Sequence, residues 1–88
     1  MVKNKEESPD NSLYITSPMV GVFYSAPSPG AEPFVKVGSR VKKGDVICIV
    51  EAMKLLNEIL AEQDGEITEV CVDNETVVEF GQKLFQMR

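Results

Sequence analysis

Residues 46–60 read VICIVEAMKLLNEIL, and this stretch supports two incompatible structures. Its opening residues, 46–50, are β-branched apart from one cysteine, which favours a strand ending near Glu51. Residues 51–63, by contrast, are rich in Ala, Met, Leu, Glu and Lys, and their apolar positions 52, 55, 56, 59 and 60 match an amphipathic helix. The choice between strand and helix determines how the amine of Lys54 is displayed.

The rest of the chain favours the strand interpretation. From Leu13 onward, short β-branched segments alternate with Gly, Pro and Asn/Asp turn signals, which is typical of an all-β sandwich or barrel. A return strand must then lie between Val50 and Gly65, so a hairpin is expected there in place of a helix. The predicted strands are 13–16, 20–24, 46–51, 65–72 and 83–87, with shorter pieces near Val41 and Val77.

A weak internal repeat supports the all-β layout. The segment SPMVGV at 17–22 can be laid over AEQDGE at 61–66, and KGDVI at 43–47 over FGQKL at 80–84. The sequence therefore predicts two related halves.

The first half carries an insertion that the second half lacks. Gly21 and Gly44 are 23 positions apart, whereas Gly65 and Gly81 are 16 apart, which leaves a net excess of seven residues. The excess lies in SAPSPGAEP at 25–33, whose three prolines stiffen the loop and exclude it from a sheet interior. From the repeat alone, this segment is a tolerated surface insertion.

Length and composition remove several classes of function. With 88 residues, 43% of them apolar, the chain is expected to be one small globular domain at 13–88 behind a flexible lead-in at 1–12. The longest apolar run is far shorter than the roughly 20 residues that cross a bilayer, and the N-terminus lacks the apolar core of a secretory signal. The net charge of -5 disfavours a nucleic-acid partner. Neither a membrane nor a nucleic acid is therefore expected as a partner.

The residue types available for chemistry are few. The chain has no histidine, which excludes Ser/His/Asp and Cys/His nucleophile pairs and, with only two cysteines, the usual zinc ligand sets. Cys48 and Cys71 are expected to be small buried hydrophobes in a reducing compartment, with a disulfide or a reactive thiol as the alternatives. Elimination leaves Lys54 as the candidate reactive group.

The residues around Lys54 resemble a known attachment motif. Glu51-Ala52-Met53-Lys54, followed by LLNEI, is similar to the motif of biotinyl domains, in which the lysine carries covalent biotin. The resemblance covers about residues 13–87 and includes SPMVG at 17–21 and VKKGD at 41–45. The proline-rich insertion at 25–33 resembles the thumb of the biotin carboxyl carrier proteins of bacterial and plastid acetyl-CoA carboxylases.

This resemblance implies a fold and overrules the helix. Members of the family form a flattened barrel, or barrel-sandwich hybrid, of two antiparallel four-stranded sheets related by a pseudo-two-fold axis. Lys54 would then lie at a hairpin tip whose residues, Ala52 to Leu55, include no Asn-Gly or Asp-Gly to favour the turn. A turn built from poor turn formers indicates that something other than folding selected them.

The neighbours of Lys54 acquire roles from the same resemblance. Glu51, Ala52 and Met53 would help a biotin protein ligase to accept the lysine, although Met53 could instead fill a gap in the core. Many members carry a second methionine where this chain has Leu55. Because leucine is apolar and similar in volume, modification is expected to survive this difference.

The thumb departs from the family pattern at one position. Some members carry a hydroxyl side chain at the position of Ala26, placed to hydrogen-bond the biotin ring. Alanine cannot make that bond, so any contact would need backbone groups, Ser25 or Ser28. The thumb residues assigned to the biotin site by resemblance are Ser25, Ala26, Pro27, Ser28, Pro29 and Gly30.

The function implied is that of a carrier and not of an enzyme. Biotin on Lys54 would accept CO2 from bicarbonate at a biotin carboxylase subunit, in a step that consumes MgATP. It would deliver the carboxyl group to acetyl-CoA at a carboxyltransferase subunit, which gives malonyl-CoA for fatty-acid biosynthesis. A biotin protein ligase is the third implied partner, and the implied location is the cytoplasm or the plastid stroma.

Three alternatives stay open. The chain could serve another biotin-dependent carboxylase or decarboxylase, although the thumb argues against this. It could be a lipoyl domain of the same fold, although such domains normally show Asp-Lys-Ala where this chain has Met53-Lys54-Leu55. It could also be a plain β-sandwich interaction module in which Lys54 is only a surface charge.

Overall fold

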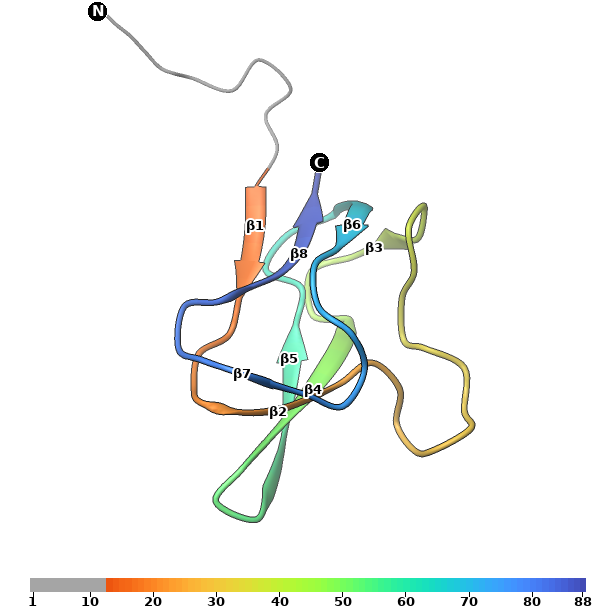
Figure 1. The fold of residues 1–88 in the computed structure, drawn as a ribbon. Helices are drawn as coiled ribbons and strands as arrows, with labels where there is room; N and C mark the ends of the chain where they lie inside the picture. The colour runs from red at the N-terminus through yellow and green to blue at the C-terminus, as the bar shows by residue number, and fades with distance from the viewer. Residues whose placement is uncertain (1–12) are drawn as a thin grey trace, which may run out of the picture.

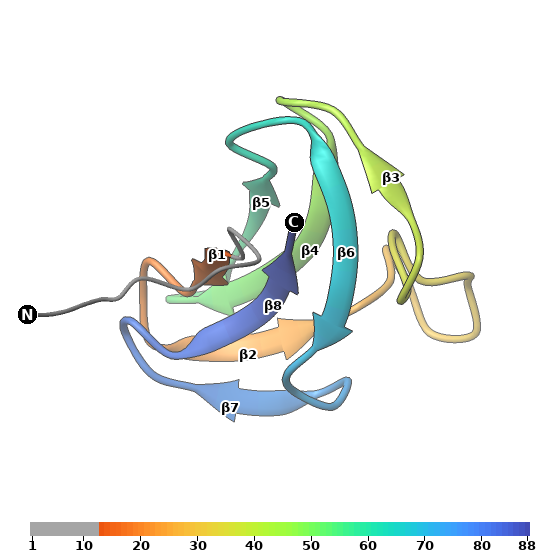
Figure 2. The same ribbon diagram turned by 90° about the horizontal axis from the view of Figure 1, so that it is seen from above.

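Two four-stranded antiparallel sheets face each other in the computed structural model, which describes residues 13–88 (Figure 1). One sheet has the strand order β1-β8-β6-β3 and the other has the order β5-β4-β2-β7. Viewed from above, the strands wrap around a common interior, so the two sheets form a flattened barrel (Figure 2). The strands are β1 (Leu13–Thr16), β2 (Gly21–Tyr24), β3 (Arg40–Val41), β4 (Val46–Ala52), β5 (Leu55–Leu60), β6 (Gly65–Val70), β7 (Thr76–Val78) and β8 (Lys83–Met87).

The predicted all-β fold is confirmed, with small shifts at strand ends. The second strand begins at Gly21, one position later than predicted, whereas β4 runs on to Ala52 and β6 ends early at Val70. No residue between 13 and 88 is helical. The helical alternative for 51–63 fails because β5 pairs along the whole of β4 and buries Ile59, and this tertiary pairing outweighs local propensity.

The predicted relation between the two halves is confirmed by matching backbone hydrogen bonds. The N–H of Gly44 donates to the carbonyl of Ala61 at 2.8 Å, and the N–H of Gly81 donates to the carbonyl of Ser17 at 2.7 Å. Both glycines have left-handed backbone, with φ of 94° and 82°. These four residues occupy equivalent places in the repeat, so the turns before β4 and before β8 are copies of one design.

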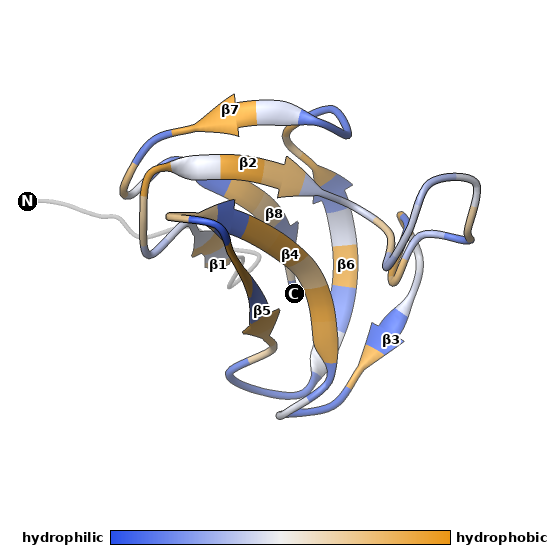
Figure 3. Cartoon of the chain, turned by 90° about the horizontal axis from the view of Figure 1, so that it is seen from below, coloured by the Kyte–Doolittle hydropathy of each residue, from blue (hydrophilic) through white to orange (hydrophobic). Residues whose placement is uncertain are grey.

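The core lies between the sheets and draws on both halves. Phe23 and Phe85 meet at its centre with ring centroids 5.9 Å apart, and neither side chain is more than 1% exposed. Each fully buried large apolar side chain contributes about 1.5–3 kcal/mol. Apolar residues dominate β4 and β2, and polar residues dominate the loops (Figure 3). The sheets therefore give the exposed turns a rigid base.

The two cysteines are free and differ in burial. Cys48 is completely buried in β4, as predicted, whereas Cys71 is only half-buried in the connection after β6. The prediction of a buried hydrophobe is therefore wrong in degree for Cys71, because that connection leaves the barrel interior. Within residues 13–88, no helix is long and apolar enough to cross a membrane.

Candidate functional site

The hairpin between β4 and β5 carries Lys54 at its tip. Ala52 pairs with Leu55, which leaves Met53 and Lys54 as a two-residue turn. Both turn residues have positive φ, 54° for Met53 and 66° for Lys54, which is the pattern of a type I′ turn. Such turns normally contain Asn-Gly, and a non-glycine residue in this conformation costs about 1 kcal/mol. The turn therefore holds two side chains at the tip at the expense of stability.

The tip is exposed and rigidly supported. The Met53 side chain is 93% exposed, which excludes a gap-filling role in the core, and Lys54 and Leu55 are exposed as well. Below the tip, the side-chain amide of Asn57 donates to the carbonyls of Val50 and Leu55, each at 3.2 Å. These two bonds brace both strands beside the turn, so the Lys54 backbone is fixed while its side chain reaches into solvent.

Glu51 is held by a residue that the sequence did not single out. The hydroxyl of Tyr24, on β2, donates a hydrogen bond of 3.0 Å to Oε1 of Glu51. This bond raises the pKa of Tyr24, because a phenolate could not donate and would repel the carboxylate. The two residues are 27 positions apart, and no sequence pattern joins them. Only the pairing of β2 with β4 brings them together.

Gly21 allows β2 to lie close against the motif strand. A Cβ atom at this position would overlap the carbonyl oxygen of Glu51 and come within 2.8 Å of Cγ1 of Val50. The sequence marked Gly21 only as a landmark of the repeat. In the structure it sets the close approach of β2 to the strand that leads to Lys54.

The thumb, residues 25–33, is an ordered loop between β2 and β3. The N–H of Ala31 donates to the carbonyl of Ser28 at 3.1 Å, and Gly30 has φ of 79°. With Pro29 before that glycine, this is the pattern of a type II turn.

The base of the thumb is closed by two hydrogen bonds at Ser25. The carbonyl of Ser25 accepts from the N–H of Phe34 at 2.9 Å, and its own N–H donates to Oδ1 of Asn74 at 2.9 Å. Asn74, in the β6–β7 connection, is a second residue that the sequence did not single out. Since this connection is part of the other half, each half contributes to the position of the thumb.

The thumb and the hairpin tip project from the body as separate features (Figures 1 and 3). Among the residues that the structure describes, no hydrogen bond joins the two. Ser25 and Ala26 are half-buried at the base of the loop, whereas Pro27, Ser28, Pro29 and Gly30 are exposed. The structure thus brings Glu51, Ala52, Met53, Lys54 and Leu55 together on one hairpin but does not place the thumb against them.

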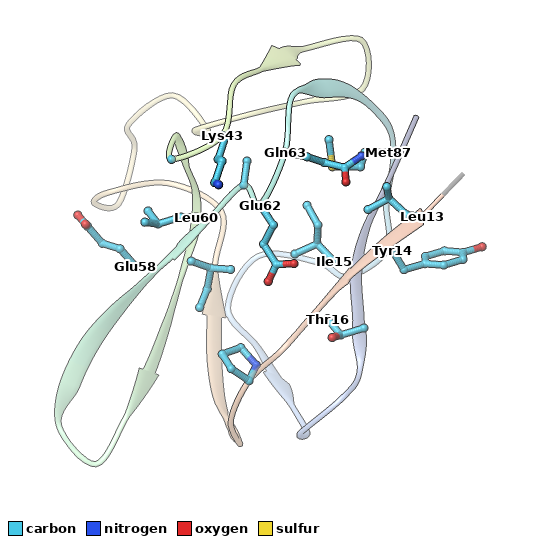
Figure 4. A pocket seen from close by; sticks show the side chains of 14 residues that line it. Leu13, Tyr14, Ile15, Thr16, Lys43, Glu58, Leu60, Glu62, Gln63 and Met87 are labelled. Carbon is cyan, nitrogen blue, oxygen red and sulfur yellow. The ribbon is translucent and has the colours of Figure 1, made fainter. Parts of the chain in front are cut away.

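A cavity in the described part of the chain lies away from the hairpin tip. It has a volume of about 540 Å³ and opens between the edge strands β1 and β5, where Ile15, Ile59 and Met87 contribute apolar surface (Figure 4). Lys43 and Glu62 lie at its rim, and Lys54 does not line it. Residues 13–88 also hold no cluster of three or more side chains that could bind a metal ion. The exposed hairpin is therefore the candidate site for chemical modification.

Relatives named as carriers cover most of this chain. The biotin carboxyl carrier protein of acetyl-CoA carboxylase from Pseudomonas aeruginosa is 55% identical over 85% of this chain and 48% of that protein. The protein of the same name from Chlamydia trachomatis is 45% identical over 97% of this chain and 52% of that protein. A chloroplastic protein of that name from Glycine max is 52% identical over 81% of this chain and 27% of its own length. The chain spans about half the length of the bacterial relatives.

Solved structures with this fold are parts of large carboxylases. The Kluyveromyces lactis urea carboxylase is similar at a TM-score of 0.74 and 27% identity, over 100% of this chain and 7% of that one. A single-chain, multi-domain long-chain acyl-CoA carboxylase is similar at a TM-score of 0.77 and 18% identity, over 96% of this chain and 8% of that one. The family described as "Biotin-requiring enzyme" matches residues 14–87. The chain therefore belongs to the biotin/lipoyl family of biotin-requiring enzymes.

Proposed function

We propose that this chain is a biotin carboxyl carrier domain of an acetyl-CoA carboxylase, with biotin attached through an amide bond to the side chain of Lys54. The observation that carries the proposal is the strained two-residue turn, which exposes Met53 and Lys54 where Asn-Gly would be more stable. Such strain at a tip without packing partners is expected where a side chain is selected for display.

The residues at the tip fit an attached biotin. The protein must offer an accessible amine for amide formation, and Lys54 is exposed on a braced hairpin. The activated carboxyl group must come from the biotin protein ligase, which uses ATP to make an acyl donor. Glu51, Ala52, Met53 and Leu55 are the proposed recognition residues for that ligase.

Bound to Lys54, biotin would supply the carriage of a carboxyl group from biotin carboxylase to acetyl-CoA at carboxyltransferase, which would give malonyl-CoA for fatty-acid synthesis. This chain contributes the presentation of the group. The two sheets fix the backbone of Lys54, and the long side chain gives reach between two active sites. Tethering replaces a diffusing intermediate by an effective concentration of about millimolar. The domain is thus a carrier and performs neither reaction itself.

The acetyl-CoA assignment is supported by the thumb and by the relatives' names. The ordered proline-rich loop at 25–33 is the feature that the proposed subfamily carries. Several relatives with 45–55% identity are named as carriers of acetyl-CoA carboxylase, in bacteria and in a chloroplast. We accordingly place the protein in the bacterial cytoplasm or the plastid stroma. We also propose that the thumb residues 25–30 contribute to the biotin site.

Intact mass spectrometry tests the attachment. After co-expression with a biotin protein ligase, the wild-type chain is expected to gain the mass of one biotin, and Lys54→Arg is expected to lose it. Lys42→Arg is the matched control, because Lys42 is also exposed and lies outside the hairpin. Addition of lipoic acid, or modification retained in Lys54→Arg, would overturn the proposal. The biotinylated chain should also support malonyl-CoA formation with purified biotin carboxylase and carboxyltransferase subunits.

A further inference from the structure

The hydrogen bond between Tyr24 and Glu51 stands apart from the others in the domain. Between described residues, it is the only hydrogen bond in which both partners are side chains. It ties β2 to the residue that lies three positions before Lys54. The core does not need this bond, because both residues are only half-buried. A role outside folding therefore has to be considered.

The residues paired with Glu51 across the sheet are apolar. In the sheet, Glu51 is paired with Leu56 on one side and Val22 on the other, and Val22 is paired with Val77. Directly paired residues share a face, so these four side chains form one row across all four strands. Leu56 is 64% exposed and Val77 is 65% exposed. The row thus presents one negative charge among accessible apolar side chains, next to the hairpin tip.

Tyr24 controls the direction of that charge. It is paired with Ile49, two residues before Glu51 on the same face, so its ring reaches diagonally across to the carboxylate. The bond occupies Oε1, and no hydrogen bond between described residues uses Oε2. A free glutamate side chain loses conformational entropy when a partner binds it, and Tyr24 removes part of that loss in advance. The hydroxyl carries its proton at neutral pH, and the hydrogen bond to Glu51 raises the pKa of Tyr24 further.

We propose that Tyr24 is a positioning residue for the modification of Lys54: it holds the Glu51 carboxylate in the orientation that a cationic or N–H donor group of the ligase binds. The inference rests on the proposed attachment of biotin to Lys54. Tyr24 acts through Glu51 and touches neither the amine nor the acyl donor. Its removal therefore weakens recognition of the domain and leaves the chemical step unchanged.

Steady-state kinetics of biotinylation tests the inference, with the purified apo chain as the varied substrate. Tyr24→Phe keeps the ring and removes only the hydroxyl, and it is expected to raise KM about three- to tenfold with little change in kcat. Glu51→Gln should raise KM more, because it removes the charge. The double variant should be no worse than Glu51→Gln alone, since the charge that Tyr24 positions is already gone.

Tyr14→Phe is the matched control, because Tyr14 is the other tyrosine of the chain, lies on β1 in the other sheet, and is 43% exposed. Its ring packs under the ammonium group of Lys83, and phenylalanine keeps that contact. The control should leave KM unchanged. Thermal unfolding of each variant monitors the fold. Glu51→Asp provides a second test that leaves β2 intact, because it withdraws the carboxylate from Tyr24, and it should also raise KM.

An unchanged KM in Tyr24→Phe, or effects of Tyr24→Phe and Glu51→Gln that multiply in the double variant, would overturn the positioning role. A rise in KM for Tyr14→Phe equal to that for Tyr24→Phe would overturn it too. These outcomes differ from failure of the proposed function, in which the wild-type chain gains no biotin at all and this inference falls with it.

Discussion

Gly38 in the first half of the domain and Glu75 in the second occupy equivalent places but are different residues. Each donates its N–H to a carbonyl on a strand of the other half, Gly38 to Ile67 on β6 at 2.8 Å and Glu75 to Phe23 on β2 at 2.7 Å. Each also has left-handed backbone, with φ of 95° and 66°. Glycine adopts this conformation freely, whereas glutamate is strained in it. The barrel therefore requires a left-handed residue at this place in each half, and the residue type there can vary.

The β4–β5 turn extends this comparison to the site. Met53 and Lys54 are the other described non-glycine residues with positive φ, and they lie at the tip where the proposed chemistry takes place. Strain of one kind thus occurs at a loop with no proposed function and at the attachment turn. Substitutions that relieve or increase backbone strain in each half can separate the residues needed for stability from those needed to present Lys54 for modification.

The largest effect is expected from Gly21→Ala, with Gly65→Ala as its counterpart in the second half. A Cβ at Gly21 meets backbone of Glu51, which cannot move without breaking the β2–β4 pairing. A Cβ at Gly65 first meets the flexible end of the Met87 side chain, at 2.6 Å. Urea unfolding should show a loss of about 3 kcal/mol or more for Gly21→Ala and clearly less for Gly65→Ala. Equal losses would contradict the asymmetry.

The two cysteines provide a test through pH. Burial raises the pKa of Cys48 from 9.0 to about 12, and burial also raises the pKa of the half-buried Cys71. Because the pKa of Cys48 is raised in the folded state, its buried thiol contributes fully to the unfolding free energy below pH 9. This contribution is lost as pH rises towards 12. The slope of the unfolding free energy approaches about 1.4 kcal/mol per pH unit.

Cys48→Ala should flatten the fall in unfolding free energy above pH 9, measured by urea unfolding at several pH values. Cys71→Ala is the control and should flatten it much less, because its thiol is already partly solvated. The same slope in Cys48→Ala and the wild type would show that the buried thiol does not titrate in this range.

Relief of strain at the tip should separate stability from function. Met53→Asn places a residue that tolerates left-handed backbone at the first turn position, so the unfolding free energy should rise by about 0.5–1 kcal/mol. Biotinylation by the ligase should become slower, because the exposed methionine is a proposed recognition residue. Thermal melting and a biotinylation time course measure the two effects. A variant that is more stable and equally well modified would remove Met53 from the recognition set.

The smallest effect is expected from Glu75→Gly, which restores the residue type found at Gly38. Relief of strain is offset in part by the greater entropy of glycine in the unfolded chain, so a gain of a few tenths of a kcal/mol is expected. Biotinylation kinetics should not change, since the β6–β7 connection lies outside the hairpin. If Glu75→Gly slowed biotinylation as much as Met53→Asn, the slower modification of Met53→Asn would have to be attributed to the change in backbone strain. It would then not show that the ligase recognises Met53.

The sequence was sufficient for the strands, because β-branched runs and turn residues alternate along most of the chain. It was ambiguous at 51–63, where the local preference for helix opposes the pairing that β4 imposes on β5. The repeat and the attachment motif together favour the hairpin, which is the structure that the chain adopts. Lys54 and its neighbours were therefore predictable as one group on a hairpin.

The contacts that support the site were not predictable. Tyr24 and Glu51, or Asn74 and Ser25, become neighbours only through strand register and loop closure, which no short motif records. Gly21 was visible as a repeat position, but its close approach to Glu51 depends on the distance between paired strands. The half-burial of Cys71 likewise depends on where a connection leaves the barrel.

The pseudo-symmetry also decides which way the domain faces. The pairing of Leu13 with Met87 between β1 and β8 is the counterpart of the pairing of Asn57 with Val50 between β5 and β4. The strands that begin and end the described chain are thus the twin of the hairpin, turned to the opposite pole of the barrel (Figure 1). Any polypeptide joined to Leu13 or Arg88 is therefore attached at the pole of the barrel opposite to Lys54. An active site can therefore accommodate the hairpin tip and Lys54 without contacting the adjoining polypeptide.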